Sequence, residues 1–99
     1  MIALTGKQKS RLRSLAMTRQ PAFQIGKEGL TPTLLQAVDD YVRKNELVKI
    51  ALLDATAVTP EDLAAALSGL DVAVVQKIGH NLVGYRPNPK LERRIELPR

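Results

Sequence analysis

The sequence predicts one α/β domain over residues 1–99, a two-layer α/β sandwich in which helices pack on a mixed sheet. Helical and strand-like patterns follow one another in the order α-β-α-β-α-β-β, which is typical of that architecture. A threonine followed by a proline begins a helix twice, at Thr31 and at Thr59. A chain of 99 residues with 44% hydrophobic content can bury one core and is too short for two.

The first helix is predicted to follow Thr5, whose hydroxyl can cap it. One face of this helix forms the expected buried stripe, which consists of Gln8, Leu12, Leu15 and Ala16. Its flanks are basic, since Lys7 lies four residues before Arg11. Lys9 has the same spacing from Arg13. Such like-charge pairs mildly oppose an isolated helix, so the pattern favours contact with a polyanion; an ordinary solvated helix is the alternative.

A loop with the sequence Gly-Lys-Glu-Gly occupies residues 26–29, after a short strand expected over residues 22–25. Its two glycines let the backbone approach a ligand closely, and Lys27 offers a cation. The helix that begins after Thr31 adds free N–H groups and the positive end of its dipole. The loop therefore indicates a phosphate-binding segment, with a simple surface turn as the alternative.

The second helix is expected over residues 32–45, and a central strand is expected over residues 47–53, which are nearly all apolar. Lys49 is the one charged residue of that strand. If its neighbours Val48 and Ile50 face the core, Lys49 projects from the opposite face of the sheet. Cations of the first helix could join it there.

The remaining elements complete the sheet. A third helix is predicted over residues 59–69 and a strand over residues 71–78. Turn residues at 79–81 lead into a hairpin partner at 82–86. A last edge strand could cover residues 91–97.

The net charge of +5 is unevenly distributed along the chain. Residues 1–27 hold six basic residues and no acid, residues 28–76 hold three basic residues and eight acids, and residues 77–99 hold six basic residues and two acids. Basic ends favour a polyanionic partner, although solvated charged surfaces explain the same charge equally well.

The composition also excludes several classes of protein. The chain has no cysteine, so a disulfide framework and a thiolate metal site are excluded, and we expect neither a metal nor a cofactor. Too few apolar residues stand at the start for a signal peptide, and no stretch approaches membrane-spanning length. We therefore expect a cytoplasmic protein with no membrane contact, monomeric by default.

Four segments, taken in order, resemble a known family. They are the basic helix over residues 7–16, the loop and helix start over 25–31, the strand Leu47-Val48-Lys49-Ile50, and the ending over 78–87. Together with residues 95–98 they resemble the CRM domain, named for chloroplast RNA splicing and ribosome maturation. The resemblance is closest to its bacterial stand-alone, YhbY-like members and covers nearly the whole chain.

The resemblance implies an RNA-binding protein that associates with ribosomal RNA in large-subunit precursors and assists ribosome assembly. It also implies a fold similar to the C-terminal domain of translation initiation factor three, and a G-x-x-G loop comparable to the KH loop that clamps a nucleic-acid backbone. Glu28 departs from that use, because a carboxylate beside phosphate is unfavourable. The predicted RNA-binding residues are Lys7, Lys9, Arg11, Arg13, Arg19, Gly26, Lys27, Glu28, Gly29 and Lys49.

Two other functions fit parts of the sequence. An enzyme acting on a phosphorylated substrate could use the same loop, but the chain has one histidine, His80, in a predicted turn, and no Walker pattern. We therefore predict no catalytic residue. A protein-interaction module could instead use the acidic segment over residues 39–71.

Overall fold

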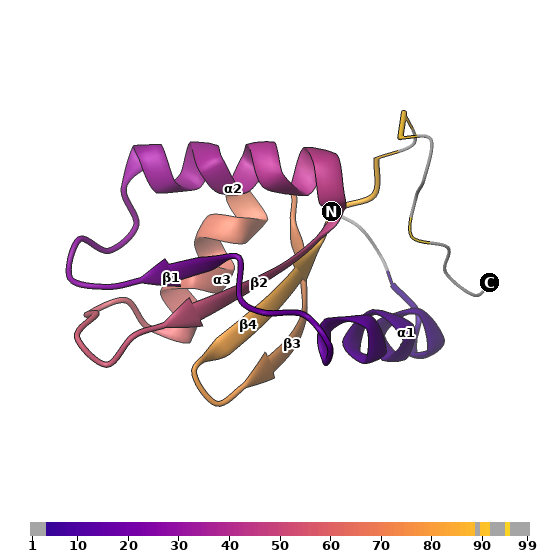
Figure 1. Ribbon diagram of the computed structural model, residues 1–99, viewed down its shortest axis with the longest axis horizontal. Helices are drawn as coiled ribbons and strands as arrows, with labels where there is room; N and C mark the ends of the chain where they lie inside the picture. The colour runs from indigo at the N-terminus through magenta and orange to yellow at the C-terminus, as the bar shows by residue number, and fades with distance from the viewer. Residues whose placement is uncertain (1–3, 89, 92–94, 96–99) are drawn as a thin grey trace.

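The computed structural model describes residues 4–88, 90, 91 and 95 of the chain (Figure 1). Its elements follow the predicted order. They are α1 (Gly6–Ala16), β1 (Phe23–Ile25), α2 (Pro32–Asn45), β2 (Leu47–Leu52), α3 (Pro60–Gly69), β3 (Ala73–Ile78) and β4 (Asn81–Tyr85). No helix in the described part of the chain is long and apolar enough to cross a membrane.

The four strands form one mixed sheet in the order β1-β2-β4-β3. β1 pairs with β2 in parallel, whereas β4 pairs antiparallel with both β2 and β3. The predicted mixed sheet is therefore confirmed. The two central strands come from distant parts of the chain, and Lys49 of β2 lies opposite Val83 of β4.

Helices cover the two faces of the sheet unequally. α2 and α3 lie on one face, where a first core contains buried side chains such as Val38, Leu67, Val48 and Leu82. α1 lies on the other face and buries only Leu12 and Ala16. These two side chains pack on a second cluster formed by Leu47, Val75, Val83 and Tyr85. The rest of that face has no helix over it in the described part of the chain (Figure 1).

Threonine begins all three described helices, as the sequence predicts. The hydroxyl of Thr31 accepts from Leu34 N at 3.0 Å, and Thr59 accepts from Asp62 N at the same distance. Thr5 and Gln8 form a capping box, in which Gln8 Oε1 accepts from Thr5 N at 3.0 Å. Of the predicted buried stripe, Leu12 and Ala16 are buried, whereas Gln8 and Leu15 are half-buried, and the amide of Gln8 also caps the helix start.

Several predicted boundaries shift by one or two residues. β1 begins at Phe23, β2 ends at Leu52 and β3 begins at Ala73. The late start of β3 follows from Asp71, whose φ of 60° is incompatible with a strand. The predicted strand over residues 91–97 falls mainly outside the described residues; within it, Leu91 and Ile95 are described and are not in a strand.

The junction between α2 and β2 is held by Glu46, which is 1% exposed and has a φ of 64°. Its carboxylate accepts hydrogen bonds from the backbone N–H groups of Asn88 at 2.8 Å and Ile95 at 2.7 Å. Its own carbonyl accepts from Arg86 N at 2.9 Å. Glu46 therefore fixes the segment that follows β4 against the end of α2.

Arg86 joins three elements from the end of β4. Its Nη1 donates to Asp39 Oδ1 at 2.8 Å and to the carbonyl of Leu70 at 2.7 Å. The hydrogen bond from Arg86, with the charges of Arg86 and Arg43, holds the pKa of Asp39 below its ordinary value of 3.8, against the opposing effect of burial. The ionised carboxylate therefore stabilises the folded state.

We expect the free energy of unfolding to depend on the ionisation of Asp39. Because the folded-state pKa lies below the unfolded value, this contribution is complete above roughly pH 4 and is lost as the pH falls through the folded pKa. Urea unfolding between about pH 5 and pH 3 should show a decline that is smaller in Asp39→Asn. Asp40→Asn, on the exposed side of the same helix, is the control and should retain the decline.

Gly84 of β4 lies under α3, where the neighbouring side chains leave no room for a Cβ. A Cβ at Gly84 would lie 2.7 Å from Cγ1 of Val72 and 3.5 Å from Cγ1 of Val48. We expect Gly84→Ala to lower the free energy of unfolding by about 1–3 kcal/mol. Gly69→Ala, whose Cβ meets nothing within 4 Å at the end of α3, should be neutral or stabilising by up to ~1 kcal/mol. Equal urea midpoints for the two variants would contradict this packing.

Candidate nucleic-acid interface

The basic surface of α1 follows from how the helix is anchored. Leu12 and Ala16 are 0% and 2% exposed because they face the sheet. Residues on the other sides of the helix consequently point away from the protein. Four of them are exposed cations, called the α1 cations below: Lys7, Lys9, Arg11 and Arg13.

The α1 cations have no acidic partner among the described residues. In the part of the chain that the structure describes, ion pairs involve Arg43, Lys77 and Arg86, and no α1 cation takes part in one. The first turn of α1 also contains no acid. The positive potential of this helix is therefore not cancelled locally.

Arg19 and Lys49 lie beside the end of α1 and are tied to each other through backbone carbonyls. Lys49 Nζ donates to the carbonyl of Arg19 at 3.3 Å, and Arg19 Nη1 donates to the carbonyl of Leu47 at 3.4 Å. Both residues are half-buried. Lys49 lies on the face of the sheet that carries α1, as expected. The two cations attach the segment after α1 to β2, so they have a structural role in addition to their charge.

The loop over residues 26–29 forms a tight turn between β1 and α2. Gly29 N donates to the carbonyl of Gly26 at 3.2 Å, and Gly29 has a φ of 70°, a conformation that favours glycine. Lys27 and Glu28 are both exposed at its tip. The loop thus presents one cation and one carboxylate side by side, directly before the N-terminus of α2.

The predicted residues do not form one compact cluster. In Figure 1 the α1 helix lies at one end of the molecule, and the loop between β1 and α2 lies at the other end. The segment over residues 17–22, which contains Arg19, connects α1 to the edge strand β1, and β1 leads to the loop. The candidate interface is therefore elongated: it runs from α1, which packs on β2, β3 and β4, to the loop that follows the edge strand β1.

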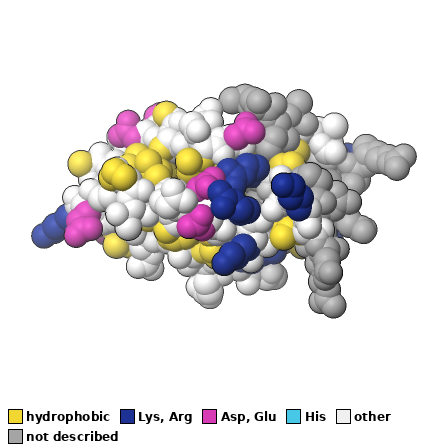
Figure 2. Space-filling model, turned by 90° about the horizontal axis from the view of Figure 1, so that it is seen from above, with side chains coloured by type: hydrophobic (Ala, Val, Ile, Leu, Met, Phe, Trp, Pro, Cys, Tyr) yellow, Lys and Arg dark blue, Asp and Glu magenta, His cyan; other side chains and the backbone are white. Residues whose placement is uncertain are grey.

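Two features of the surface were missed in the sequence. One is a basic hollow of about 280 Å³ lined by Arg43, Arg86, Lys90, Pro87 and Asn88. Figure 2, seen from the α2 side, shows Lys and Arg side chains gathered toward one end, with Asp and Glu side chains beside them. The guanidinium groups of Arg43 and Arg86 are held by Asp39, so much of this charge is already compensated.

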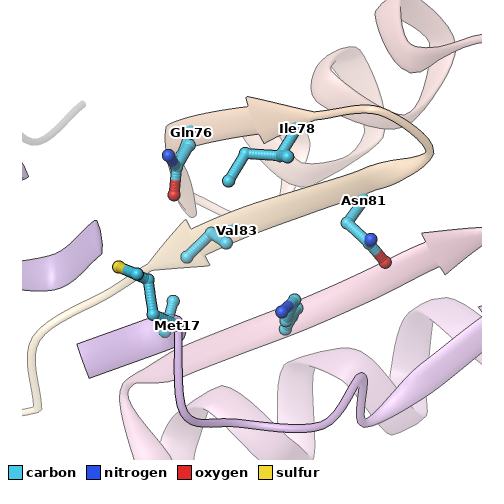
Figure 3. Close-up of a pocket in the computed structure, with 7 residues that line it drawn as sticks. Met17, Gln76, Ile78, Asn81 and Val83 are labelled. Carbon is cyan, nitrogen blue, oxygen red and sulfur yellow. The ribbon is translucent and has the colours of Figure 1, made fainter. Parts of the chain in front are cut away.

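The other missed feature is a depression of about 50 Å³ on the sheet face that α1 leaves uncovered. We call it the open-face depression; its polar walls are Lys49, Gln76 and Asn81, and its apolar walls include Met17 and Ile78 (Figure 3). Alternation along β2 placed Lys49 on this face, but the bulge between Val74 and Gln76 shifts the register of β3. Strict alternation of side chains along the strands could therefore not have predicted which residues line the open-face depression.

Comparison with known sequences identifies close relatives. The sequence model of the CRS1/YhbY (CRM) domain matches residues 4–86. A Bacillus subtilis relative named "Probable RNA-binding protein YqeI" is 38% identical over 96 residues, which make up 96% of this chain and 99% of that protein. A Haemophilus influenzae relative named "RNA-binding protein" is 36% identical over 100 residues, covering 100% of this chain and 99% of the relative.

A solved structure shares the fold. A hypothetical protein from Staphylococcus aureus, known from a solution structure, superposes with a TM-score of 0.77 and is 41% identical. The match covers 97% of this chain and 100% of that protein. The predicted α/β fold is therefore confirmed by a homologue as well as by the arrangement of the elements.

A mixed four-stranded sheet with two helices on one face, a basic helix on the other and a G-x-x-G loop defines a small α/β domain with a cationic edge. The chain belongs to the CRS1/YhbY (CRM) domain family. The resemblance inferred from its four sequence segments is confirmed.

The two glycines of the loop should respond differently to alanine. Gly29→Ala forces a left-handed conformation and brings a Cβ to 3.4 Å from Cγ2 of Val58, so we expect a loss of about 1–2 kcal/mol in the free energy of unfolding. Gly26→Ala meets only Cδ1 of Leu53 at an ordinary 3.6 Å and should change stability by less than about 0.5 kcal/mol. Urea unfolding measures both, and the reverse order would contradict the loop geometry.

Proposed function

We propose that this protein binds RNA, chiefly through the phosphate backbone, and that the α1 cations supply most of the affinity. The observation that carries the proposal is that these four side chains are exposed and free of ion pairs within the described part of the chain, whereas Arg43, Lys77 and Arg86 are paired. A cation without an acidic neighbour can release the counterions of a phosphate chain at full effect. The names of the two bacterial relatives support the same partner.

The aromatic side chains favour backbone recognition over base stacking. The chain has three, and Tyr85 is 3% exposed in the second core. Phe23 and Tyr41 pack edge to face with ring centroids 5.5 Å apart, against the first core. None of the three therefore offers a free stacking platform of the kind that many single-strand binders use.

The loop over residues 26–29 would provide a second contact at the far end of the interface. Its glycines allow close approach of a backbone, and Lys27 adds a charge, while Glu28 would have to turn away from phosphate. Arg19 lies on the path between the two contacts. Because Gly26→Ala is expected to leave the fold intact, a loss of RNA affinity in that variant would assign a binding role to the loop.

The biological target proposed here is ribosomal RNA in precursors of the large subunit, with a role in assembling that subunit in the cytoplasm as a monomer. This part rests on the family, whose name refers to ribosome maturation, and on the basic edge. A phosphate-binding enzyme is the weaker candidate, since His80 lies exposed in the turn between β3 and β4. A protein-interaction module is also a weaker candidate, because Asp39 and Glu46 of the acidic segment are engaged within the fold.

Neutralising the helix should weaken RNA binding and its salt dependence together. We expect Lys9→Gln with Arg13→Gln to reduce the slope of log K against log salt by about 1.4 on a single strand or 1.8 on a duplex. The matched control is Lys44→Gln with Lys77→Gln, which removes the same charge from exposed positions outside α1 and should leave the slope unchanged. Fluorescence anisotropy measures both slopes. If the two double variants lose the same amount of slope, net charge alone explains the effect and the α1 cations have no special role.

Sedimentation of a lysate tests the ribosomal target. The tagged protein should migrate with precursors of the large subunit in a sucrose gradient and should move to the top after ribonuclease treatment. The Lys9→Gln, Arg13→Gln variant should stay at the top without treatment. If the wild-type protein remains at the top of the gradient at low salt, the proposal of a ribosomal target is wrong. The salt-slope experiment then tests whether the protein binds RNA at all.

A further inference from the structure

The open-face depression combines apolar walls with polar groups at its rim. Val83 at its base is 2% exposed, whereas Met17 and Ile78 at its sides are 76% and 50% exposed. Exposed apolar side chains on either side of a depression can cover the faces of a planar ring. In Figure 3 the Gln76 amide points from β3 toward the side where Met17 lies.

The polar groups of the depression offer both an acceptor and donors. Gln76 Oε1 is shielded from solvent and has no hydrogen-bond partner among the described residues. Lys49 Nζ uses one of its three N–H bonds on the carbonyl of Arg19. The Asn81 amide lies on the neighbouring strand β4. An acceptor without a partner is costly when shielded, so a ligand that donates to Gln76 would gain from this site.

The charge around the depression narrows the class of ligand. No carboxylate among the described residues lines it, and Ala16 and Met17 at its edge belong to the end of the helix that carries the α1 cations. A phosphate chain lying along α1 would therefore bring its bases next to the depression. A volume of about 50 Å³ admits the edge of a ring rather than a whole nucleotide.

We propose that the open-face depression holds one unstacked base of the bound RNA strand, with its ring between Met17 and Ile78 and its edge at Gln76. The inference rests on the proposed RNA binding and adds base selectivity to it. Gln76 Oε1 is shielded, so neighbouring side chains have to move for the base to reach it, and the flexible, exposed side chain of Met17 can do so. Recognition of unstacked bases along their edges is the usual way in which proteins read single-stranded RNA.

The hydrogen-bond acceptor Oε1 of Gln76 determines which base the depression prefers. Adenine and cytosine each carry an amino group beside a ring nitrogen, so the amino group donates to Gln76 Oε1 while Lys49 donates to the ring nitrogen. In the same register uracil places its O4 carbonyl against Gln76 Oε1 and its N3–H against the Lys49 ammonium, so it has to shift from that register before N3–H can donate to Gln76 Oε1. Cytosine and adenine should therefore bind better than uracil.

Oligonucleotides of a single base test this preference, and cytosine against uracil is the sharpest pair because the rings have the same size. At fixed salt we expect oligo-C and oligo-A to bind roughly tenfold more tightly than oligo-U. Gln76→Leu, which removes the acceptor, should bring the three affinities together and leave the salt slope unchanged. Gln24→Leu changes an exposed glutamine of β1 outside the depression and should keep the preference.

The outcomes separate this inference from the proposed function. Salt-sensitive binding that is equal for the three oligonucleotides, or a preference that survives Gln76→Leu, overturns the base site and leaves RNA binding in place. Absence of salt-sensitive binding to any of them overturns RNA binding itself.

Nuclear magnetic resonance provides a second readout that does not depend on phosphate contacts. Cytidine monophosphate should shift the side-chain amide resonances of Gln76 and Asn81, and uridine monophosphate should shift them less. The contrary outcome has two parts: neither nucleotide shifts the amide resonances, and Ile78→Ser abolishes self-association of the protein. In that case the depression is a contact between copies of the chain, and the proposed base site is wrong.

Discussion

The two central strands are buried on both faces at one end of the sheet, and most of the structure follows from this. Leu47 and Val48 are neighbours on β2, point to opposite faces, and are 1% and 0% exposed. α2 and α3 can cover only one of these faces, so α1 must cover the other. Burial of Leu12 and Ala16 then determines which side of α1 faces outward, and that side carries the cations. The basic surface is thus a consequence of closing the second core.

The same constraint explains why the cations of this chain have different roles. Arg86 and Arg43 lie where α2 meets the end of β4, and there Asp39 pairs with both. α1 packs on the opposite face of the sheet, and only its side with Leu12 and Ala16 contacts that face. In the described structure no acid of the acidic segment therefore reaches the α1 cations. A count of charges along the sequence does not distinguish the α1 cations from Arg43 and Arg86. Only their neighbours decide which of them can bind a polyanion.

Sequence reasoning succeeds here where the signal is local. The Thr-Pro helix starts, the apolar run of β2 and the placement of Lys49 each depend on a few adjacent residues, and the structure agrees with them. It fails where the partner is distant: Arg86 is bound by Asp39, 47 positions earlier, and Glu46 accepts from Ile95, 49 positions later. Gln8 shows the intermediate case, because its helical position suits both the buried stripe and the capping box. The predicted RNA-binding residues stay predictions, because their role depends on a partner outside the chain.

The length of α1 links backbone binding to base recognition. Its 11 residues cover one end of the sheet face and stop at Ala16, so the face beyond that point, with Lys49 and Gln76, stays open. The uncovered surface lies over β2, β4 and β3 beside the end of α1, so a strand held by the α1 cations can place a base there before it continues toward the distant loop at the β1 edge. Phosphate contacts at both ends would fix the register of the strand without reading its sequence. A single polar depression between them is then sufficient to favour one kind of base at one position, without the aromatic platform that this chain lacks.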